Sequence, residues 1–343
     1  MDGLELSVKK GEILGLVGES GCGKSVTALS IVGLLPPNAK VESGQVFLNG
    51  IDLLTMEKEN LRLARLNSVA MVFQDPMTYL NPVLTVGDQI TEIIMAAPKA
   101  FTRTLIEERL NEIHRRERAE SSPRLQKEKL RLESALSKGK LSGRELKHLA
   151  RTYVESILTL VRLPEPERIF QRFPYELSGG MRQRVMIAMA LVRRPKVMLA
   201  DEITTALDVT VQAQILQLLV ELKEEIDTSI VLITHDLGIV AEVCDRVAVM
   251  YAGNIVEVAK VDELFANPLH PYTKGLLASV PRPDVVLPTL ASIVGSVPNL
   301  IRPPAGCRFH PRCPMAFDRC RSTKPPLIEV SPGHFVECLL YGG

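Results

Sequence analysis

Eight consecutive residues near the N-terminus have the composition and spacing of a phosphate-binding loop. They are Gly18, Glu19, Ser20, Gly21, Cys22, Gly23, Lys24 and Ser25. Glycines allow backbone N–H groups to turn inward around phosphate oxygens, and the N-terminus of a following helix adds its positive dipole end. Lys24 would reach the β- and γ-phosphates of a nucleotide, and the Ser25 hydroxyl would ligate Mg²⁺. The alternative is an accidental glycine-rich turn, which the expected strand before the loop and helix after it argue against.

Two acidic residues, Asp201 and Glu202, follow an apolar run at residues 197–200. A strand that ends in two acids would place Asp201 beside the Mg²⁺ ion and allow Glu202 to act as general base on an attacking water. Taken alone, such a pair is a common strand end. Together with a phosphate-binding loop, it favours a nucleotide-hydrolysing site.

A Ser-Gly-Gly turn precedes the apolar helical run at residues 185–191. The turn comprises Leu177, Ser178, Gly179, Gly180 and Met181. A helix N-terminus attracts anions because its first N–H groups lack intrahelical partners and its dipole end is positive. The segment is therefore either a second anion site or an ordinary capped helix start.

Four of the six cysteines, Cys307, Cys313, Cys320 and Cys338, are gathered near the C-terminus with the spacing C-x₅-C-x₆-C-x₁₇-C. The spacing lacks the close C-x₂-C pairs of most zinc sites. In a chain without a secretion signal, four thiolates in a proline-rich segment suit an iron–sulfur cluster first and zinc second. Free structural thiols are the alternative.

The elements that must position these motifs form an α/β pattern. Buried strands are expected at residues 13–17, 69–73, 197–200, 230–234 and 247–251, with helical stretches between most of them. This alternation predicts a mostly parallel sheet covered on both faces.

Two segments differ from the rest in composition. Residues 101–150 hold 13 Lys or Arg and 8 Glu, which predicts a charged, protruding helical hairpin broken at Pro123. Residues from 259 onward hold 13 of the 23 prolines. We therefore expect a loop-rich tail there, with short helices at residues 261–266 and 271–279.

Length, charge and hydropathy exclude several classes of protein. A chain of 343 residues is long enough for an α/β core with an appendage. Its net charge of +1 gives no electrostatic case for binding nucleic acid or an anionic membrane. No apolar run approaches the roughly 18 to 20 residues of a membrane-spanning helix, and the N-terminus has no signal-peptide core. If the protein works at a membrane, we expect it on the cytoplasmic side, held by partners.

Six motifs occur in the order seen in ABC ATPases, which the sequence resembles over residues 1–258 apart from the charged segment. They are the phosphate-binding loop, Gln74 with its neighbours, the Leu-Ser-Gly-Gly turn, Asp201-Glu202, residues 206–208 and residues 234–236. The resemblance implies a P-loop fold with a RecA-like core and an antiparallel β portion. It also implies a helical subdomain over about residues 75–192, carrying the hairpin at about residues 98–150.

The same resemblance implies a role for each motif. Two such domains would dimerise head to tail, with each ATP held between the phosphate-binding loop of one and the Ser-Gly-Gly helix of the other. Gln74 would join Ser25 and Asp201 at the Mg²⁺ ion and link it to membrane subunits. Asp208 would contact the partner domain, and His235 would contact the γ-phosphate.

The tail, residues 259–343, resembles that of oligopeptide and dipeptide importer ATPases. The resemblance is carried by residues 270–273 and 306–314, and residues 23–27 and 80–85 resemble the D-type subunit. It implies ATP hydrolysis coupled to peptide import, with a second ATPase subunit, two membrane permeases and an external peptide-binding protein. It also favours a [4Fe–4S] cluster over zinc. Because the tail cysteines follow every ATPase motif in sequence, we expect them to lie away from the nucleotide.

Three alternatives stay open at this point. The importer could carry nickel complexes or sugars, because the solute does not touch this subunit. A soluble ABC protein acting on nucleic acid or ribosomes is weakly suggested by the basic bias of residues 101–150, and the importer-type tail argues against it. A non-hydrolysing partner subunit is the third. It is suggested because the family's adenine-stacking aromatic residue is not found before the loop, and Phe47 and Phe73 are expected elsewhere. Ile203 also replaces a proline that is usual in the family.

Overall fold

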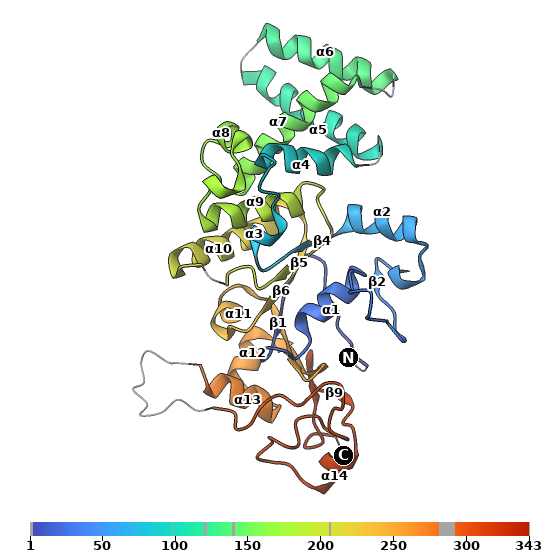
Figure 1. Ribbon diagram of the computed structural model, residues 1–343, viewed down its shortest axis with the longest axis vertical. Coiled ribbons are helices and arrows are strands. Elements are labelled where there is room, and N and C mark those ends of the chain that lie inside the picture. The colour runs from blue at the N-terminus through green and yellow to red at the C-terminus, as the bar shows by residue number, and fades with distance from the viewer. Residues whose placement is uncertain are drawn as a thin grey trace. The chain divides into compact units, whose positions relative to one another are not determined.

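The computed structural model describes residues 3–97, 99–119, 122–138, 141–205, 207–280 and 292–342 (Figure 1). The chain divides into two compact units. Unit 1 comprises Met1–Gln74 and Lys196–Gly343, and unit 2 comprises Asp75–Pro195. Among the described residues, no helix is long and apolar enough to cross a membrane.

Unit 1 is built on a mixed sheet of eight strands within the described residues, in the order β4-β5-β6-β1-β7-β8-β10-β9. Neighbouring strands from β4 to β7 in this order are parallel, and those from β7 to β9 are antiparallel. The strands are β1 (Ile13–Val17), β4 (Val69–Val72), β5 (Val197–Asp201), β6 (Ser229–Thr234), β7 (Arg246–Tyr251), β8 (Asn254–Lys260), β9 (Leu327–Ser331) and β10 (His334–Glu337). The five strands expected from the sequence are confirmed, with small shifts at their ends.

The central strands form the core because nearly all of their residues are apolar and buried. Every residue of β1 and β6 is buried, as expected for parallel strands covered on both faces. The helices of unit 1 are α1 (Lys24–Ile31), α2 (Lys58–Ser68), α10 (Val209–Ile226), α11 (Leu237–Val243), α12 (Val261–Ala266), α13 (Pro271–Ala278) and α14 (Asp318–Ser322). A 3₁₀ turn, η1 (Leu53–Thr55), follows the small hairpin of β2 (Phe47–Leu48) and β3 (Ile51–Asp52).

Unit 2 consists of helices and connecting loops in its described residues. It contains α3 (Pro76–Tyr79), α4 (Val86–Met95), α5 (Lys99–Ala119), α6 (Pro123–Lys138), α7 (Gly143–Leu160), α8 (Pro166–Gln171), the 3₁₀ turn η2 (Pro174–Glu176) and α9 (Gly179–Leu191). The charged segment forms α5, α6 and the start of α7. Arg109 of α5 is paired with Glu128 of α6 at 2.8 Å, and Lys129 of α6 with Glu117 of α5 at 3.0 Å. Some of its charges therefore join helices to each other rather than facing only solvent.

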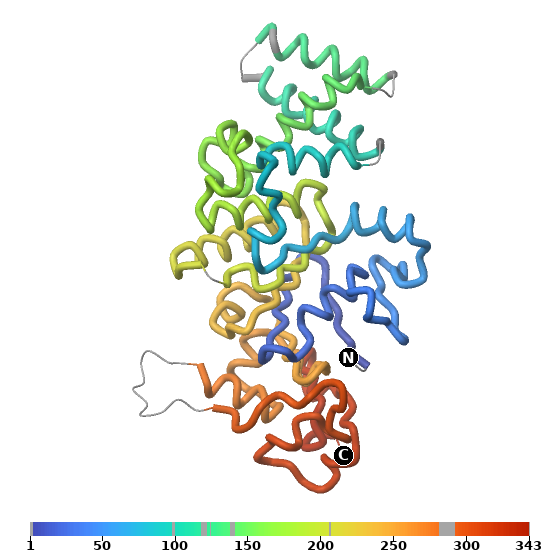
Figure 2. The backbone as a smooth tube through the Cα atoms, in the orientation of Figure 1, coloured from blue at the N-terminus to red at the C-terminus, as the bar shows by residue number. Residues whose placement is uncertain are grey.

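The C-terminal tail is more regular than its proline content suggested. The two expected short helices are confirmed as α12 and α13. Beyond them, β10 pairs with β8 and with β9, so the tail extends the main sheet. The red C-terminal part of the tube in Figure 2 contains the segment that pairs with β8.

A buried polar cluster fastens the tail strand to β8. The side chain of Glu257 on β8 is fully buried, and its Oε1 lies 2.8 Å from Nε2 of His334 on β10. The Glu257 carboxylate also accepts backbone hydrogen bonds from Leu269 and His270. His334 is a buried residue of β10 although it lies in the proline-rich tail. Buried charge is tolerated here because its hydrogen-bonding capacity is used.

Candidate functional site

The phosphate-binding loop connects β1 to α1, as the sequence predicted. Gly18 has a φ of 159°, and a Cβ there would lie 2.1 Å from the carbonyl oxygen of Met250, so only glycine fits. Gly23 is the left-handed residue before α1, with a φ of 112°. Lys24 is 5% exposed, and its Nζ donates to the carbonyl oxygens of Gly18 at 2.7 Å and Glu19 at 3.2 Å. The lysine ammonium is thus held inside the loop that it would share with phosphate.

Ser25 and Asp201 lie together although 176 residues separate them in sequence. The Ser25 hydroxyl donates to Oδ1 of Asp201 at 3.2 Å. Burial raises the pKa of the Asp201 carboxyl, while the hydrogen bond from Ser25 acts in the opposite direction. A hydroxyl and a carboxylate at this separation are oxygen donors of the kind that Mg²⁺ prefers, so these residues fit that ion.

Glu202 is surrounded by three polar side chains. Gln74 Nε2 donates to Glu202 Oε2 at 3.0 Å, and His235 Nδ1 lies 3.4 Å from Oε1. Thr205 adds a longer contact of 3.4 Å to Oε2, which the sequence did not single out. Glu202 has a φ of 47°, a conformation that is uncommon for a residue with a side chain. Local strain of this kind gathers at functional sites, at a cost of about 1–3 kcal/mol.

Strand register explains why these groups meet. Strands β5, β6 and β1 are parallel neighbours, so their carboxyl ends lie at one edge of the sheet. Asp201 is in register with Ile233, and Thr234 with Val17. The acids after β5, His235 after β6 and the loop after β1 therefore converge. Ligands of α/β sheets bind at this edge.

The Ser-Gly-Gly turn lies in unit 2, at the start of α9. Ser178 is the N-cap residue, and its hydroxyl accepts a hydrogen bond from the Met181 N–H at 3.3 Å. Leu177 is buried, Ser178 and Gly179 are exposed, and Gly180 and Met181 are half-buried. The turn is therefore a capped helix start whose first residues, Ser178 and Gly179, are exposed.

Asp208 also has a local structural task. It is the N-cap residue of α10, and its carboxylate accepts a hydrogen bond from the Val211 N–H at 3.0 Å. Asp208 is also exposed. Capping accounts for an aspartate here without any partner, and its exposure leaves it available for one.

The tail contacts the phosphate-binding loop directly. Arg312 donates from Nη1 and Nη2 to the Glu19 carboxylate at 2.7 and 3.1 Å. Tyr272 Oη accepts the Glu19 N–H at 2.9 Å. We expected the tail cysteines to lie away from the nucleotide, and Arg312 immediately precedes Cys313. The fold therefore brings the segment next to Cys313 back to the loop through Arg312, and the distance of the cysteines from the nucleotide stays a prediction. No local sequence pattern signalled this contact across 293 residues.

The four tail cysteines lie near one another without forming an evident metal site. The backbone N–H of Cys307 donates to the carbonyl of Cys320 at 2.9 Å, and all four are free thiols. Burial raises the pKa of Cys307 to about 11 and raises those of Cys313 and Cys338, with smaller contributions from the neighbouring thiols. Among the described residues, no group of three or more His, Cys, Asp or Glu side chains is arranged to hold a metal. The predicted metal centre has no support in this geometry.

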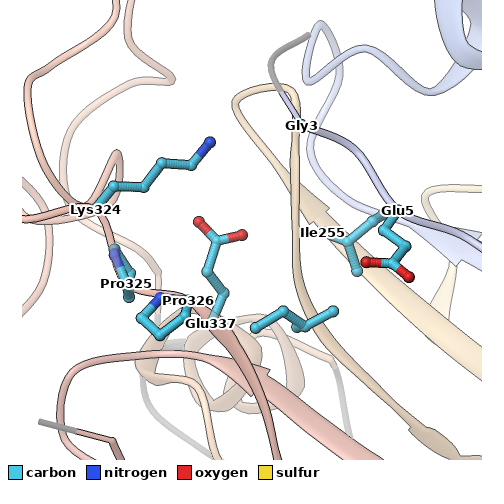
Figure 3. Close-up of a pocket in the computed structure, with 8 residues that line it drawn as sticks. Gly3, Glu5, Ile255, Lys324, Pro325, Pro326 and Glu337 are labelled. Atoms are coloured by element: carbon cyan, nitrogen blue, oxygen red, sulfur yellow. The ribbon is translucent and has the colours of Figure 1, made fainter. Parts of the chain in front are cut away.

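A cavity of about 360 Å³ lies elsewhere in unit 1 (Figure 3). It is lined by Gly3, Glu5, Ile255, Lys324, Pro325, Pro326, Leu327 and Glu337. These residues come from the N-terminal segment, β8 and the tail. None of them belongs to the predicted nucleotide motifs, so the cavity is separate from the phosphate-binding loop.

Comparison with known protein families decides what these motifs belong to. The ABC transporter family matches residues 1–205. The oligopeptide/dipeptide transporter C-terminal region matches residues 256–320. The chain belongs to the ABC transporter family. The family and fold predicted from the sequence are therefore confirmed, as is the enzyme class, an ABC-type ATPase, and ATP with Mg²⁺ is the ligand of that family.

Individual relatives and structures agree with this membership of the ABC transporter family. The chain is 48% identical over 341 residues to the probable peptide ABC transporter ATP-binding protein y4tR of Sinorhizobium fredii, covering 98% of this chain and 88% of that protein. It is 44% identical to the oligopeptide transport ATP-binding protein AppD of Bacillus subtilis, covering 99% and 90%. The solved dimer of the ATP-binding cassette MJ0796 with ADP and Pi is 27% identical, with a TM-score of 0.54 over 75% of this chain and 89% of that one.

Proposed function

We propose that this ABC transporter chain is the ATP-hydrolysing subunit that energises import of di- or oligopeptides, acting at the cytoplasmic face of a membrane. The observation that carries the proposal is the convergence of Lys24, Asp201 and Glu202 at the carboxyl edge of the parallel sheet. The C-terminal region typical of oligopeptide and dipeptide transporters supports peptides as the solute. The relatives of the chain include oligopeptide and dipeptide transport ATP-binding proteins.

In this proposal each of these side chains has a task. Lys24 binds the β- and γ-phosphates of ATP, and Ser25 with Asp201 holds Mg²⁺, with Gln74 as a further ligand. When bound, Mg²⁺ neutralises charge on the phosphate oxygens. Glu202 takes a proton from the attacking water at its carboxylate, which Gln74 and His235 hold in place.

Hydrolysis also needs a second ATPase subunit. In this proposal the exposed start of α9, residues 177–181, closes over ATP bound to the partner's loop, and Asp208 contacts that partner. The free N–H groups and positive dipole end of α9 suit a phosphate. ATP-driven closure and reopening then move two permease subunits, and an external binding protein delivers the peptide.

Peptide uptake by the reconstituted transporter tests this function. The chain would be purified with its partner ATPase and permeases, placed in liposomes, and supplied with ATP, the binding protein and a labelled tripeptide. The parent transporter should accumulate the tripeptide, and Glu202→Gln should abolish this accumulation. Accumulation of a nickel complex or a sugar instead of peptides would overturn the assigned solute class.

We propose further that Cys307, Cys313, Cys320 and Cys338 bind a [4Fe–4S] cluster, with zinc as the second choice. The proposal rests on four thiols in one compact segment and on the chemistry of thiolates, which suit iron–sulfur clusters. Anaerobic purification followed by iron and sulfide analysis tests it. Four irons and four sulfides per chain are expected. One zinc would favour the second metal, and a metal-free protein would exclude both.

A further inference from the structure

Glu19 connects the tail to the lysine of the phosphate-binding loop. Its backbone N–H donates to Tyr272 Oη at 2.9 Å, and its carboxylate receives two hydrogen bonds from Arg312. Its carbonyl oxygen accepts from Lys24 Nζ at 3.2 Å. The residue that the tail holds on two sides is thus bonded directly to the ammonium group that meets phosphate.

The Arg312 side chain is also held by contacts within the tail. Its side chain is 7% exposed, and its Nε donates to the carbonyl of Val294 at 2.9 Å. Its Nη2 also donates to the carbonyl of Ile293 at 3.2 Å, and its guanidinium lies 5.8 Å from the ring centroid of Tyr251. Exposed ion pairs contribute little to stability, whereas a bidentate and largely buried pair has fixed geometry. The guanidinium therefore defines where the Glu19 carboxylate sits.

An aromatic cluster docks the same part of the tail beside the loop. The ring of Phe309 packs against Tyr251 and Tyr272, with centroid distances of 5.0 and 5.4 Å, and all three residues are buried. The neighbouring Arg308 donates to the carbonyl of Ala252. The next residue, Gly253, donates its N–H to the carbonyl of Cys22 in the loop at 2.8 Å. Two separate routes therefore run from the tail to the loop.

We propose that the C-terminal extension is a positioning element of the nucleotide site, in which Arg312 acts through Glu19 to hold the phosphate-binding loop in its binding shape. The proposal rests on the ATPase function proposed above. It also has an electrostatic part. The Glu19 carboxylate is a negative charge in a loop that must accept the phosphates of ATP, and Arg312 compensates that charge. Tail docking and nucleotide binding then favour each other, because coupling between two sites is reciprocal.

Nucleotide affinity of four variants tests the charge argument. Titration of the purified complex with a fluorescent ATP analogue gives the dissociation constant of the parent, Arg312→Met, Glu19→Gln and the double variant. Arg312→Met alone should weaken binding roughly tenfold, within the range usual for coupled sites. The double variant should recover most of this loss, because it lacks the uncompensated carboxylate. Arg321→Met, which removes an exposed arginine at the end of α14, should bind as the parent does.

Amide hydrogen exchange of the tail tests whether nucleotide binding in turn stabilises tail docking. A purely structural role of Arg312 would not make this exchange depend on the nucleotide. In the parent, adding the nucleotide should slow amide exchange in residues 301–342, and Arg312→Met should lose this nucleotide-dependent protection. An Arg312→Met variant with parental affinity, or a double variant as weak as the single one, would overturn the proposal. If the parent itself failed to bind the nucleotide, the proposed ATPase function would fail first, so the two failures are distinguishable.

Discussion

Gln74 and Glu202 lie 128 residues apart in sequence, yet the Gln74 amide donates a 3.0 Å hydrogen bond to the Glu202 carboxylate. Gln74 follows the edge strand β4, and Glu202 follows its neighbour β5, so strand pairing alone brings them together. Gln74 contacts Oε2 of Glu202, the candidate general base, and His235 contacts Oε1. The two residues therefore hold different oxygens of the same carboxylate. The two contacts together fix the orientation of the Glu202 carboxylate.

Replacing Glu202 by glutamine should separate hydrolysis from binding. Glu202→Gln keeps the hydrogen-bonding shape but cannot take a proton, so the turnover rate should fall by roughly 10²- to 10⁴-fold. Affinity for ATP should stay near the parent value, and a stable ATP-bound dimer should accumulate. Lys24→Ala should instead weaken ATP binding itself. Steady-state phosphate release and nucleotide titration measure the two effects.

The matched control for this prediction is Glu224→Gln, on the exposed side of α10. It makes the same chemical change far from the strand ends and should hydrolyse ATP as the parent does. Parental turnover by Glu202→Gln would show that another group is the base.

Ser178 should matter for hydrolysis beyond its task as a helix cap. Loss of an N-cap serine costs about 1 kcal/mol of stability, typically. Ser142 supplies the comparison, because it caps α7 of the same unit through a capping box with Glu145. Ser178→Ala and Ser142→Ala should lower the melting temperature by similar amounts, whereas only Ser178→Ala should slow ATP turnover. Equal turnover in the two variants would mean that Ser178 is a cap and nothing more.

Asp208 can be tested with two substitutions that treat its cap and its charge differently. Asparagine is as good an N-cap residue as aspartate, whereas alanine costs about 1 kcal/mol. Asp208→Asn should therefore retain the parent's melting temperature, and Asp208→Ala should lower it. Both should weaken ATP-dependent dimerisation, measured by light scattering, if the charge contacts a partner. Unchanged dimerisation of Asp208→Asn would leave only the capping role.

His270 should make stability depend on pH. Burial lowers the pKa of this histidine to about 3, and its Nδ1 accepts the Tyr272 N–H at the start of α13. The unfolded chain binds a proton near pH 6.5 and the folded chain does not, so stability should fall as pH falls from 6.5 toward 3. At pH 5 the loss from this group approaches about 2 kcal/mol.

Asparagine at position 270 keeps a capping side chain and cannot titrate. The free energy of unfolding of His270→Asn should therefore fall less between pH 7 and pH 5 than that of the parent. His148→Asn, at an exposed position of α7, should retain the parental pH dependence. A His270→Asn variant as pH-sensitive as the parent would show that the tail does not bury a neutral histidine.

The sequence was sufficient for the parts of the site that depend on strand ends. Each motif directly follows a buried strand: Gly18–Ser25 follows one, and Asp201 with Glu202 follows another. Because the carboxyl ends of parallel strands lie at the same edge of a sheet, both motifs were expected at that edge. The structure has Ser25 in contact with Asp201 there. The apolar runs in the sequence identify the strands, and the parallel pairing of those strands brings the motifs at their ends together.

The tail was less predictable for a physical reason. Its contacts depend on how a proline-rich chain folds back over long sequence distances, and no periodicity records that path. Nothing in the local sequence indicates that Arg312 reaches the phosphate-binding loop or that His334 lies on a strand paired with β8. The aromatic contacts of Phe309 likewise join residues that are far apart in sequence. Thr205, which contacts Glu202, was likewise without a signal of its own.

Phosphate release from MgATP by the complete transporter in liposomes tests the central claim most directly. The account predicts that the rate rises when a peptide-loaded binding protein is added on the side away from this subunit. It also predicts that Glu202→Gln shows neither basal nor stimulated release. Stimulation that ignores the peptide, or release that continues in the Glu202→Gln transporter, would contradict the claim that this chain couples ATP hydrolysis to peptide import.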